Sequence, residues 1–357
     1  MALSCGIIGL PMAGKTTFFN LLTGSHTQTG AYAGGKPGAG AGHARIPDER
    51  VDYLVNIYKP RKTTYAQLEI IDVPGLARSG EGFLSAVREC DALALIVRGF
   101  KNDEVPHTEG SLDVIRDIGA INTELLLADL QLVETRLGRI HDGKKKKQDS
   151  PLEEAALEKC MALLTEEKPL VSSVFTDDEH DALKSISFIT GKPLLIIINL
   201  DEEQYNTGEW PQKKQVEEYC ETHGYALMEV CARLEEEISR LPEGERGMFM
   251  DELGIMESGV SRLARALYGQ LRLASFLTVG EDEVRAWTIP QGLPARQAAG
   301  KIHSDIERGF IRAETVAYVH FKEAGSMAAV RDKGYFRLEG KEYPVQDGDI
   351  ISFRFNV

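Results

Sequence analysis

Residues 9–16 read Gly-Leu-Pro-Met-Ala-Gly-Lys-Thr and complete the GxxxxGK[ST] pattern of a phosphate-binding loop. A phosphate cradle needs several backbone N–H donors that converge on one point, and glycines such as Gly9 and Gly14 let the backbone curl that closely. The apolar residues 3–8 are predicted to form a strand before the loop, and residues 17–22 to begin a helix whose N-terminal dipole favours an anion. A Gly-rich turn that matches by accident is the alternative, but the strand–loop–helix context favours a nucleotide-binding protein.

Each residue type in this loop has its own chemistry. Lys15 is predicted to reach the β- and γ-phosphates, and the Thr16 hydroxyl to bind Mg²⁺, the cofactor that we expect. The predicted phosphate-binding residues are Gly9, Met12, Ala13, Gly14, Lys15, Thr16 and Thr17.

A second nucleotide motif follows the strand predicted over residues 65–71. Asp72-Val73-Pro74-Gly75 has the DxxG form of a switch II turn, in which Asp72 holds Mg²⁺ through a water and the Gly75 N–H meets the γ-phosphate. In isolation, a plain D-x-P-G turn would be the better interpretation. Leu76 stands where Ras-type switches place a water-orienting Gln. Leucine cannot polarise water, so no catalytic residue is assigned and slow hydrolysis is predicted.

A third motif is predicted to contact the base. Buried strands are predicted over residues 92–97 and 193–198, and the second leads into Asn199-Leu200-Asp201-Glu202, where guanine-binding proteins carry NKxD. Glu202 is one methylene longer than Asp, and Leu200 replaces the lysine, so guanine selection is weakened and the Leu200 side chain could lie against a base. An acidic strand-to-helix corner is the alternative.

A strand predicted over residues 226–230 leads to Cys231-Ala232, where such proteins place a loop whose backbone touches the base. Cys231 could equally be a buried core thiol.

Composition indicates a cytoplasmic protein without a membrane partner. The 357 residues allow two or three domains, and the net charge of −14 disfavours indiscriminate nucleic-acid binding. The five cysteines are scattered and odd in number, which is typical of a reducing compartment. We expect no signal peptide, and the longest apolar stretch is far too short to span a bilayer.

Between the predicted strands, residues 111–190 carry apolar side chains at helical spacing and are predicted to form an inserted helical hairpin with Lys144–Lys147 at its tip. These lysines fit a solvated loop better than an RNA contact. Residues 30–42, with six glycines, occupy the place of a switch I loop and lack a threonine for Mg²⁺; we expect them to be mobile without ligand.

The C-terminal region has a different pattern. Short strands are predicted over residues 284–289, 315–320, 335–338 and 350–355, with a helix over 294–306, which favours an α+β, β-grasp module. Trp287 fits a core position, whereas Lys301 and Arg308 could be solvated or could meet RNA or ribosomal protein.

The chain resembles the Obg-like ATPases of the YchF type across nearly its whole length. The resemblance rests on GLPMAGKTTFFN (9–20), RIPDERVD (45–52), DVPGL (72–76), RECDALALIVRGF (88–100), NLDE (199–202) and two C-terminal stretches (283–314 and 343–357). It implies a phosphate-loop domain with a helical insertion and a C-terminal TGS module, preference for ATP over GTP, and ribosome association. The altered switch I and switch II segments leave γ-phosphate sensing open and identify a divergent paralogue as an alternative.

We therefore predict an α/β fold in which a P-loop NTPase (G-domain-like) sheet, residues 1–110 and 191–274, carries the hairpin, 111–190, and is followed by a β-grasp (TGS) domain, 275–357. The predicted function is that of an ATP-binding NTPase that also accepts GTP and acts as a slow switch on the ribosome. The alternative is a nucleotide-regulated binding module that has lost hydrolysis and works through its TGS domain and hairpin. A metabolic kinase is a distant third reading.

Overall fold

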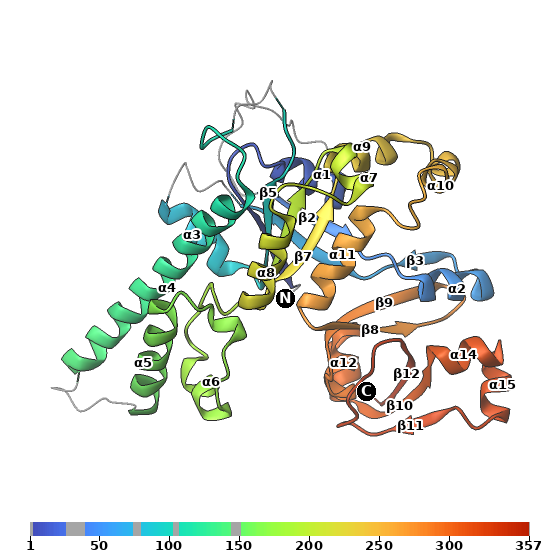
Figure 1. Ribbon diagram of the computed structural model, residues 1–357. Coiled ribbons are helices and arrows are strands. Elements are labelled where there is room, and N and C mark those ends of the chain that lie inside the picture. The colour runs from blue at the N-terminus through green and yellow to red at the C-terminus, as the bar shows by residue number, and fades with distance from the viewer. Residues whose placement is uncertain (1–2, 26–39, 74–79, 103–106, 144–150, 357) are drawn as a thin grey trace. The chain divides into compact units, whose positions relative to one another are not determined.

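The computed structural model describes residues 3–25, 40–73, 80–102, 107–143 and 151–356 (Figure 1). The chain divides into two compact units, the first from residues 1–43 and 69–263 and the second from residues 44–68 and 264–357. Within the described ranges, no helix is both long and apolar enough to cross a membrane.

The first unit is built on a sheet in which β1 (Ser4–Ile8) lies between two parallel neighbours, β4 (Gln67–Asp72) and β5 (Ala92–Arg98). The full strand order is β2-β4-β1-β5-β6-β7, with β2 at Gly40–Arg45, β6 at Leu194–Asn199 and β7 at Ala226–Val230. The order reverses its direction at β1, and ligands of open α/β sheets bind at such switch points. The phosphate loop leaves β1 at this place and runs into α1 (Lys15–Thr23), which confirms the predicted fold class.

Three helices cover one face of this sheet: α3 (Gly80–Glu89), α4 (Val114–Gly143) and α8 (Lys213–His223). Farther along α4, its apolar side chains pack with those of α5 (Pro151–Thr165) in a separate core, which gives the predicted hairpin (Figure 1). The lysines predicted at its tip lie outside the described residues. The remaining helices of this unit are a 3₁₀ turn (Leu170–Ser172), α6 (Asp177–Leu183), α7 (Glu202–Thr207), α9 (Ala232–Arg240) and α10 (Glu243–Glu252).

The second unit contains a mixed sheet of order β11-β10-β12-β8-β9-β3. Its strands are β3 (Lys62–Thr64), β8 (Leu273–Thr278), β9 (Glu283–Pro290), β10 (Phe310–Ala317), β11 (Arg337–Glu339) and β12 (Asp349–Phe355). Its helices are α2 (Glu49–Tyr58), α12 (Ala295–Ile302), α13 (Ser304–Arg308), α14 (Tyr318–Ala324) and α15 (Met327–Asp332), while α11 (Gly259–Gln270) spans the boundary between the units. Trp287 stacks on Phe276 with ring centroids 6.1 Å apart and packs against the core beneath α12, as predicted.

Three local predictions were wrong in part. The strand predicted at residues 315–320 ends at Ala317, because the chain turns into α14 at Tyr318. The helix predicted over 294–306 is two helices, separated by the extended backbone of His303. Residues 40–42 of the predicted mobile segment belong to β2, and residues 30–39 lie outside the described residues.

The compact units also differ from the expected domain boundaries. Residues 44–68 belong with the C-terminal strands because β3 pairs in parallel with β9, with Lys62 opposite Glu283. Arg50 at the start of α2 adds two hydrogen bonds to Asp347, at 2.7 and 3.3 Å. No local sequence pattern predicts either contact.

Candidate nucleotide-binding site

The phosphate loop has the backbone that its glycines predict. Gly9 and Gly14 have φ values of 148° and 102°. A Cβ on Gly9 would lie 2.3 Å from the Ile96 oxygen, and one on Gly14 would lie 2.6 Å from the Asn199 amide nitrogen. Met12 also has a positive φ, 63°, and its side chain is 37% exposed at the outer turn of the loop. Glycine is thus required at both ends of the loop by backbone conformation and by space.

Lys15 reaches back over the loop. Its Nζ donates to the carbonyl oxygens of Gly9 and Leu10, both at 2.9 Å. Burial lowers the pKa of Lys15 to about 8, and the nearby Asp72 opposes this shift. The ammonium group therefore sits at the mouth of the loop in a poorly solvated place, where an anion would stabilise its charge.

Thr16 and Asp72 lie side by side, although the sequence places them 56 residues apart. The Thr16 hydroxyl donates to the Asp72 carboxylate at 3.4 Å, and burial raises the pKa of Asp72 against the opposing effects of Lys15 and Thr16. A hydroxyl and a carboxylate are oxygen ligands of the kind that Mg²⁺ takes when phosphates and waters complete its shell. Among the described residues, no group of three or more His, Cys, Asp or Glu could hold a metal ion.

Asn199 joins the phosphate loop to the loop that is predicted to touch the base. Its amide nitrogen donates to the Ala13 oxygen at 3.0 Å, and its amide oxygen accepts from the Ala232 N–H at 3.1 Å. The side chain is 4% exposed, and Cys231 and Ala232 are buried beside it. Both halves of the amide are used, so Asn199 fixes the distance between the two loops.

The side chain of Leu200 does not have the expected position. It is 2% exposed and belongs to the core beneath α3 and α4. Its neighbour Asp201 caps α7 in a reciprocal pair with Gln204, at 2.9 and 3.0 Å. Glu202 is the exposed first residue of α7. The acidic corner interpretation thus accounts for Asp201, and Glu202 is the exposed carboxylate of the motif.

A buried polar cluster that sequence reasoning did not single out lies behind the phosphate loop. A cavity of about 10 Å³, room for one water, is lined by Leu10, Pro11 and Ala13 together with Arg98, His107 and Asp117. His107 pairs with Asp117 at 2.9 Å, and one Arg98 guanidinium nitrogen has no hydrogen-bond partner among the described residues. The hydroxyl of Thr108 donates to the Pro11 oxygen at 3.3 Å. Arg98, His107 and Asp117 come from β5, a loop and α4, so no local spacing in the sequence could have identified this support.

Two predicted residues of the switch II turn cannot be placed. Gly75 and Leu76 lie outside the described residues, so the interpretations attached to them stay predictions.

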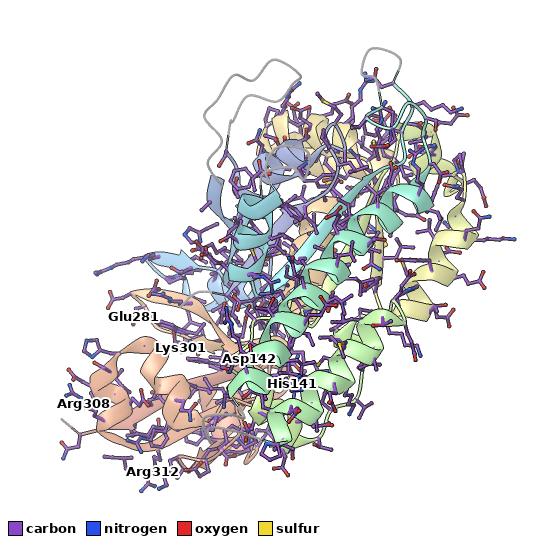
Figure 2. All side chains as sticks on the ribbon, turned by 90° about the vertical axis from the view of Figure 1, so that its left-hand side faces the viewer. His141, Asp142, Glu281, Lys301, Arg308 and Arg312 are labelled. Atoms are coloured by element: carbon purple, nitrogen blue, oxygen red, sulfur yellow. The ribbon has the colours of Figure 1, made fainter. Side chains whose placement is uncertain are left out.

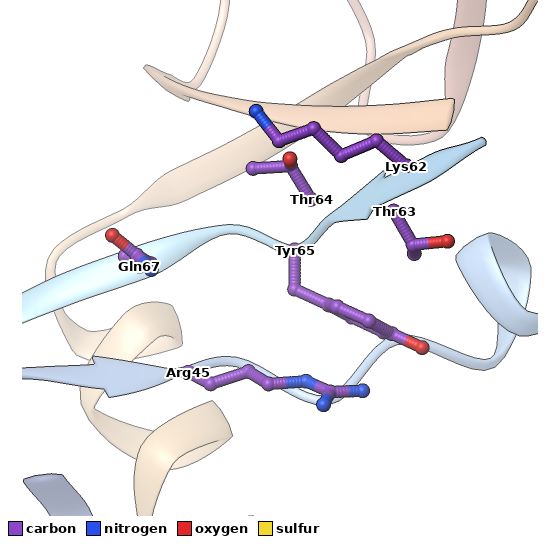
Figure 3. Close-up of a pocket in the computed structure, with 6 residues that line it drawn as sticks. All are labelled: Arg45, Lys62, Thr63, Thr64, Tyr65 and Gln67. Carbon is purple, nitrogen blue, oxygen red and sulfur yellow. The ribbon is translucent and has the colours of Figure 1, made fainter. Parts of the chain in front are cut away.

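The second unit has a polar pocket of its own, about 630 Å³, lined by Arg45, Lys62, Thr63, Thr64, Tyr65 and Gln67 (Figure 3). The Arg45 guanidinium lies over the Tyr65 ring, 3.5 Å from its centroid, and the Tyr65 hydroxyl donates to Asp52. Lys62 is 68% exposed and pairs with Glu283 at 3.3 Å. The pocket thus combines an aromatic face with cations that are partly neutralised.

Comparison with known proteins covers both ends of the chain. Residues 4–135 match a family described as 50S ribosome-binding GTPase, and residues 273–356 match the YchF GTPase C-terminal family, described as a protein of unknown function (DUF933). The chain is 42% identical over 366 residues to the ribosome-binding ATPase YchF of Bacillus subtilis, with 100% of both chains covered. It is 36% identical to Obg-like ATPase 1 of Caenorhabditis elegans, covering 99% of this chain and 92% of that one. The structure of the Schizosaccharomyces pombe YchF GTPase matches with a TM-score of 0.85 and 30% identity, covering 99% and 97% of the two chains.

Proposed function

Because the chain belongs to the YchF family of Obg-like ATPases, we propose that it is an ATP-binding P-loop NTPase that works as a slow nucleotide-dependent switch on the ribosome. The observation that carries this proposal is the convergence of Lys15, Thr16 and Asp72 at the end of β1. Relatives named ribosome-binding ATPases support both the substrate and the partner.

The loop and its neighbours have separate roles in this proposal. Backbone N–H groups between Gly9 and Thr17 cradle the phosphates, and the Lys15 ammonium exchanges its carbonyl partners for phosphate oxygens. Thr16 and Asp72 would hold Mg²⁺, which when bound supplies positive charge beside the phosphates. Asn199 holds the backbone of Ala232 at the place where the base would lie.

The same residues favour ATP without excluding GTP. Guanine selection needs a carboxylate in plane with the base edge, and each good bidentate contact is worth about 1–3 kcal/mol by analogy with base readout in nucleic acids. Glu202 is longer than the required Asp, and the buried Leu200 offers the base nothing polar from its side chain. Backbone groups near Leu200 and Cys231 can serve adenine instead.

Hydrolysis in this proposal is slow. Leu76 stands at the position of the water-orienting Gln, so the isolated chain is expected to turn over at about 10⁻⁴–10⁻² per second, as unassisted switches do.

We propose that the second unit supplies part of the ribosome contact, with the helical hairpin as a second contact. Lys301, Arg308 and Arg312 lie exposed on the second unit, where they could meet phosphates (Figure 2). Arg45 and Tyr65 line the pocket of the same unit, and an aromatic ring with a stacked guanidinium suits an unpaired RNA base.

Turnover with and without ribosomes tests the function. We expect the full chain to hydrolyse ATP in the range above, and ribosomes to raise that rate at least several-fold. The Lys15→Ala variant is the control, because it removes the phosphate contact without removing core volume. An isolated chain that turns over many times per second would contradict the switch, and so would a rate that ribosomes leave unchanged.

A nucleotide-regulated binding module without hydrolysis is the second candidate, and Leu76 is the observation that favours it. Single-turnover experiments with excess protein separate the two. Release of less than one phosphate per bound ATP over many hours, with ribosomes present, would favour the module.

A further inference from the structure

The end of α3 is joined to two other elements by one side chain. α3 is the first described element after Asp72 of the DxxG motif, and Arg88 lies in its last turn. The Arg88 guanidinium donates to the Ala128 oxygen at 3.0 Å and to the Asp129 carboxylate at 3.1 Å, both in α4. It also donates to the Ser187 oxygen at 2.7 Å, in the segment that precedes β6.

Asp129 extends this connection. Its carboxylate is fully buried, and besides Arg88 it accepts from the Ile189 N–H at 3.1 Å and from the Thr190 N–H and hydroxyl at 2.7 and 2.9 Å. One carboxylate thus ties the middle of α4 both to α3 and to the residues that lead into β6. β6 ends at Asn199, which holds the phosphate loop.

The backbone at the end of α3 is bound from the same segment. The Arg88 carbonyl oxygen accepts from the Ser187 hydroxyl at 3.0 Å and from Lys192 Nζ at 2.9 Å, and Lys192 also donates to the Cys90 oxygen. These bonds satisfy carbonyls that a helix end leaves without intrahelical partners. Both the side chain and the backbone of Arg88 therefore bind the segment before β6, and the side chain also binds α4.

A purely structural role is the simpler interpretation, and the apolar core bears on it. Phe83 and Val87 of α3, Ile118 and Ile121 of α4, and Ile189 already pack together in one buried cluster. That packing is non-directional and would hold the three elements together without the polar network. A multi-point network anchored on the buried Asp129 carboxylate instead fixes one relative orientation, because a small displacement breaks several bonds at once.

We propose that Arg88 and Asp129 are positioning residues, which couple α3, the first described helix after Asp72, to the helical hairpin that α4 begins. The coupling rests on the proposed function, because it requires nucleotide at the phosphate loop. A change at the nucleotide site between the triphosphate and diphosphate states then reaches α3, and the network passes this change to α4. Two rigid elements joined by a discrete bonded contact are the physical link that such transmission needs.

Hydrogen–deuterium exchange of the full chain, saturated in turn with Mg²⁺–ADP and a non-hydrolysable Mg²⁺–ATP analogue, tests this link. In the wild type, we expect peptides from residues 114–143 to exchange at least threefold differently in the two complexes. In the Arg88→Gln variant this difference should shrink below 1.5-fold, while peptides from residues 9–23 stay protected and the Kd for each nucleotide stays within about twofold. Arg139→Gln is the matched control, because Arg139 is an exposed arginine of α4, the helix whose exchange is measured.

Arg88→Lys keeps a charge beside Asp129 but cannot reach the Ser187 and Ala128 oxygens together. This variant replaces Arg88→Gln if the latter fails to fold. Its difference in exchange of residues 114–143 between the two complexes should be at most half that of the wild type. A wild-type difference in exchange of residues 114–143 in either Arg88 variant would overturn the coupling. A wild-type protein in which these residues exchange equally in both complexes, while residues 9–23 are protected, would overturn it as well. Absence of protection at residues 9–23 in the wild type would instead overturn the proposed function, and the coupling with it.

Discussion

Truncation of Asn199 to alanine should damage the nucleotide site more than its contribution to the core suggests. The change removes the 3.0 Å bond to the Ala13 oxygen and the 3.1 Å bond from the Ala232 N–H, at a position that is 4% exposed. Each buried group left without a partner costs about 1–3 kcal/mol. We therefore expect the free energy of unfolding to fall by about 2–4 kcal/mol. The two loops would no longer be held at a fixed distance, and the affinity for ATP should fall about 10–100-fold, or about 1.4–2.7 kcal/mol.

Asn122→Ala is the matched control for this experiment. Asn122 is 6% exposed, donates to the Tyr219 hydroxyl at 3.0 Å and accepts from the Tyr225 hydroxyl at 2.8 Å, so both halves of its amide bind tyrosines outside the phosphate loop. Urea unfolding and calorimetric titration of both variants separate stability from affinity. The expected result is a similar loss of stability in both, with weaker ATP binding in Asn199→Ala alone. Unchanged ATP affinity in Asn199→Ala would refute the view that this amide organises the site.

Three further changes test the surrounding structure. Lys15→Ala should abolish tight triphosphate binding and leave the unfolding midpoint nearly unchanged; calorimetry that finds wild-type affinity would mean that the loop is not the site. Gly14→Ala places a methyl group against the Asn199 amide at a φ of 102°, so it should cost about 1–3 kcal/mol of stability together with ATP binding, and an unaffected variant would contradict the loop geometry. Glu235 is a carboxyl that accepts from the Gly259 N–H, and burial raises its pKa in the folded protein. The folded protein therefore loses stability as the pH rises from the pKa of Glu235 in the unfolded chain, about 4.3, through its higher pKa in the folded protein. In urea unfolding, the free energy of unfolding of the neutral Glu235→Gln variant should rise relative to that of the wild type as the pH increases through this range. A difference between the two proteins that is independent of pH would contradict a raised pKa for Glu235.

The sequence predicted the phosphate loop because its requirements are local. Positive φ at Gly9 and Gly14 and a lysine followed by a hydroxyl are fixed within eight residues. The contact of Thr16 with Asp72 was also predictable, because the loop before Thr16 leaves β1 and Asp72 ends β4, which lies beside β1 in a parallel sheet.

Contacts between distant segments could not be predicted in this way. The pairing of β3 with β9 and the bonds of Arg88 and Asp129 join residues whose local patterns show no sign of one another. Leu200 illustrates a different limit. As a leucine after a strand it could face either the base or the core, and the packing of the whole sheet decides for the core.

Calorimetric titration of the full chain with ATP and with GTP, in the presence of Mg²⁺, tests the central claim most directly. The site offers guanine no in-plane Asp carboxylate, so ATP should bind at least as tightly as GTP. The double variant Leu200→Lys with Glu202→Asp should shift the preference toward GTP, incompletely because the buried Cys231-Ala232 turn also shapes the base site. A wild-type chain that binds GTP tenfold or more tightly than ATP, a difference of about 1.4 kcal/mol, would contradict the account.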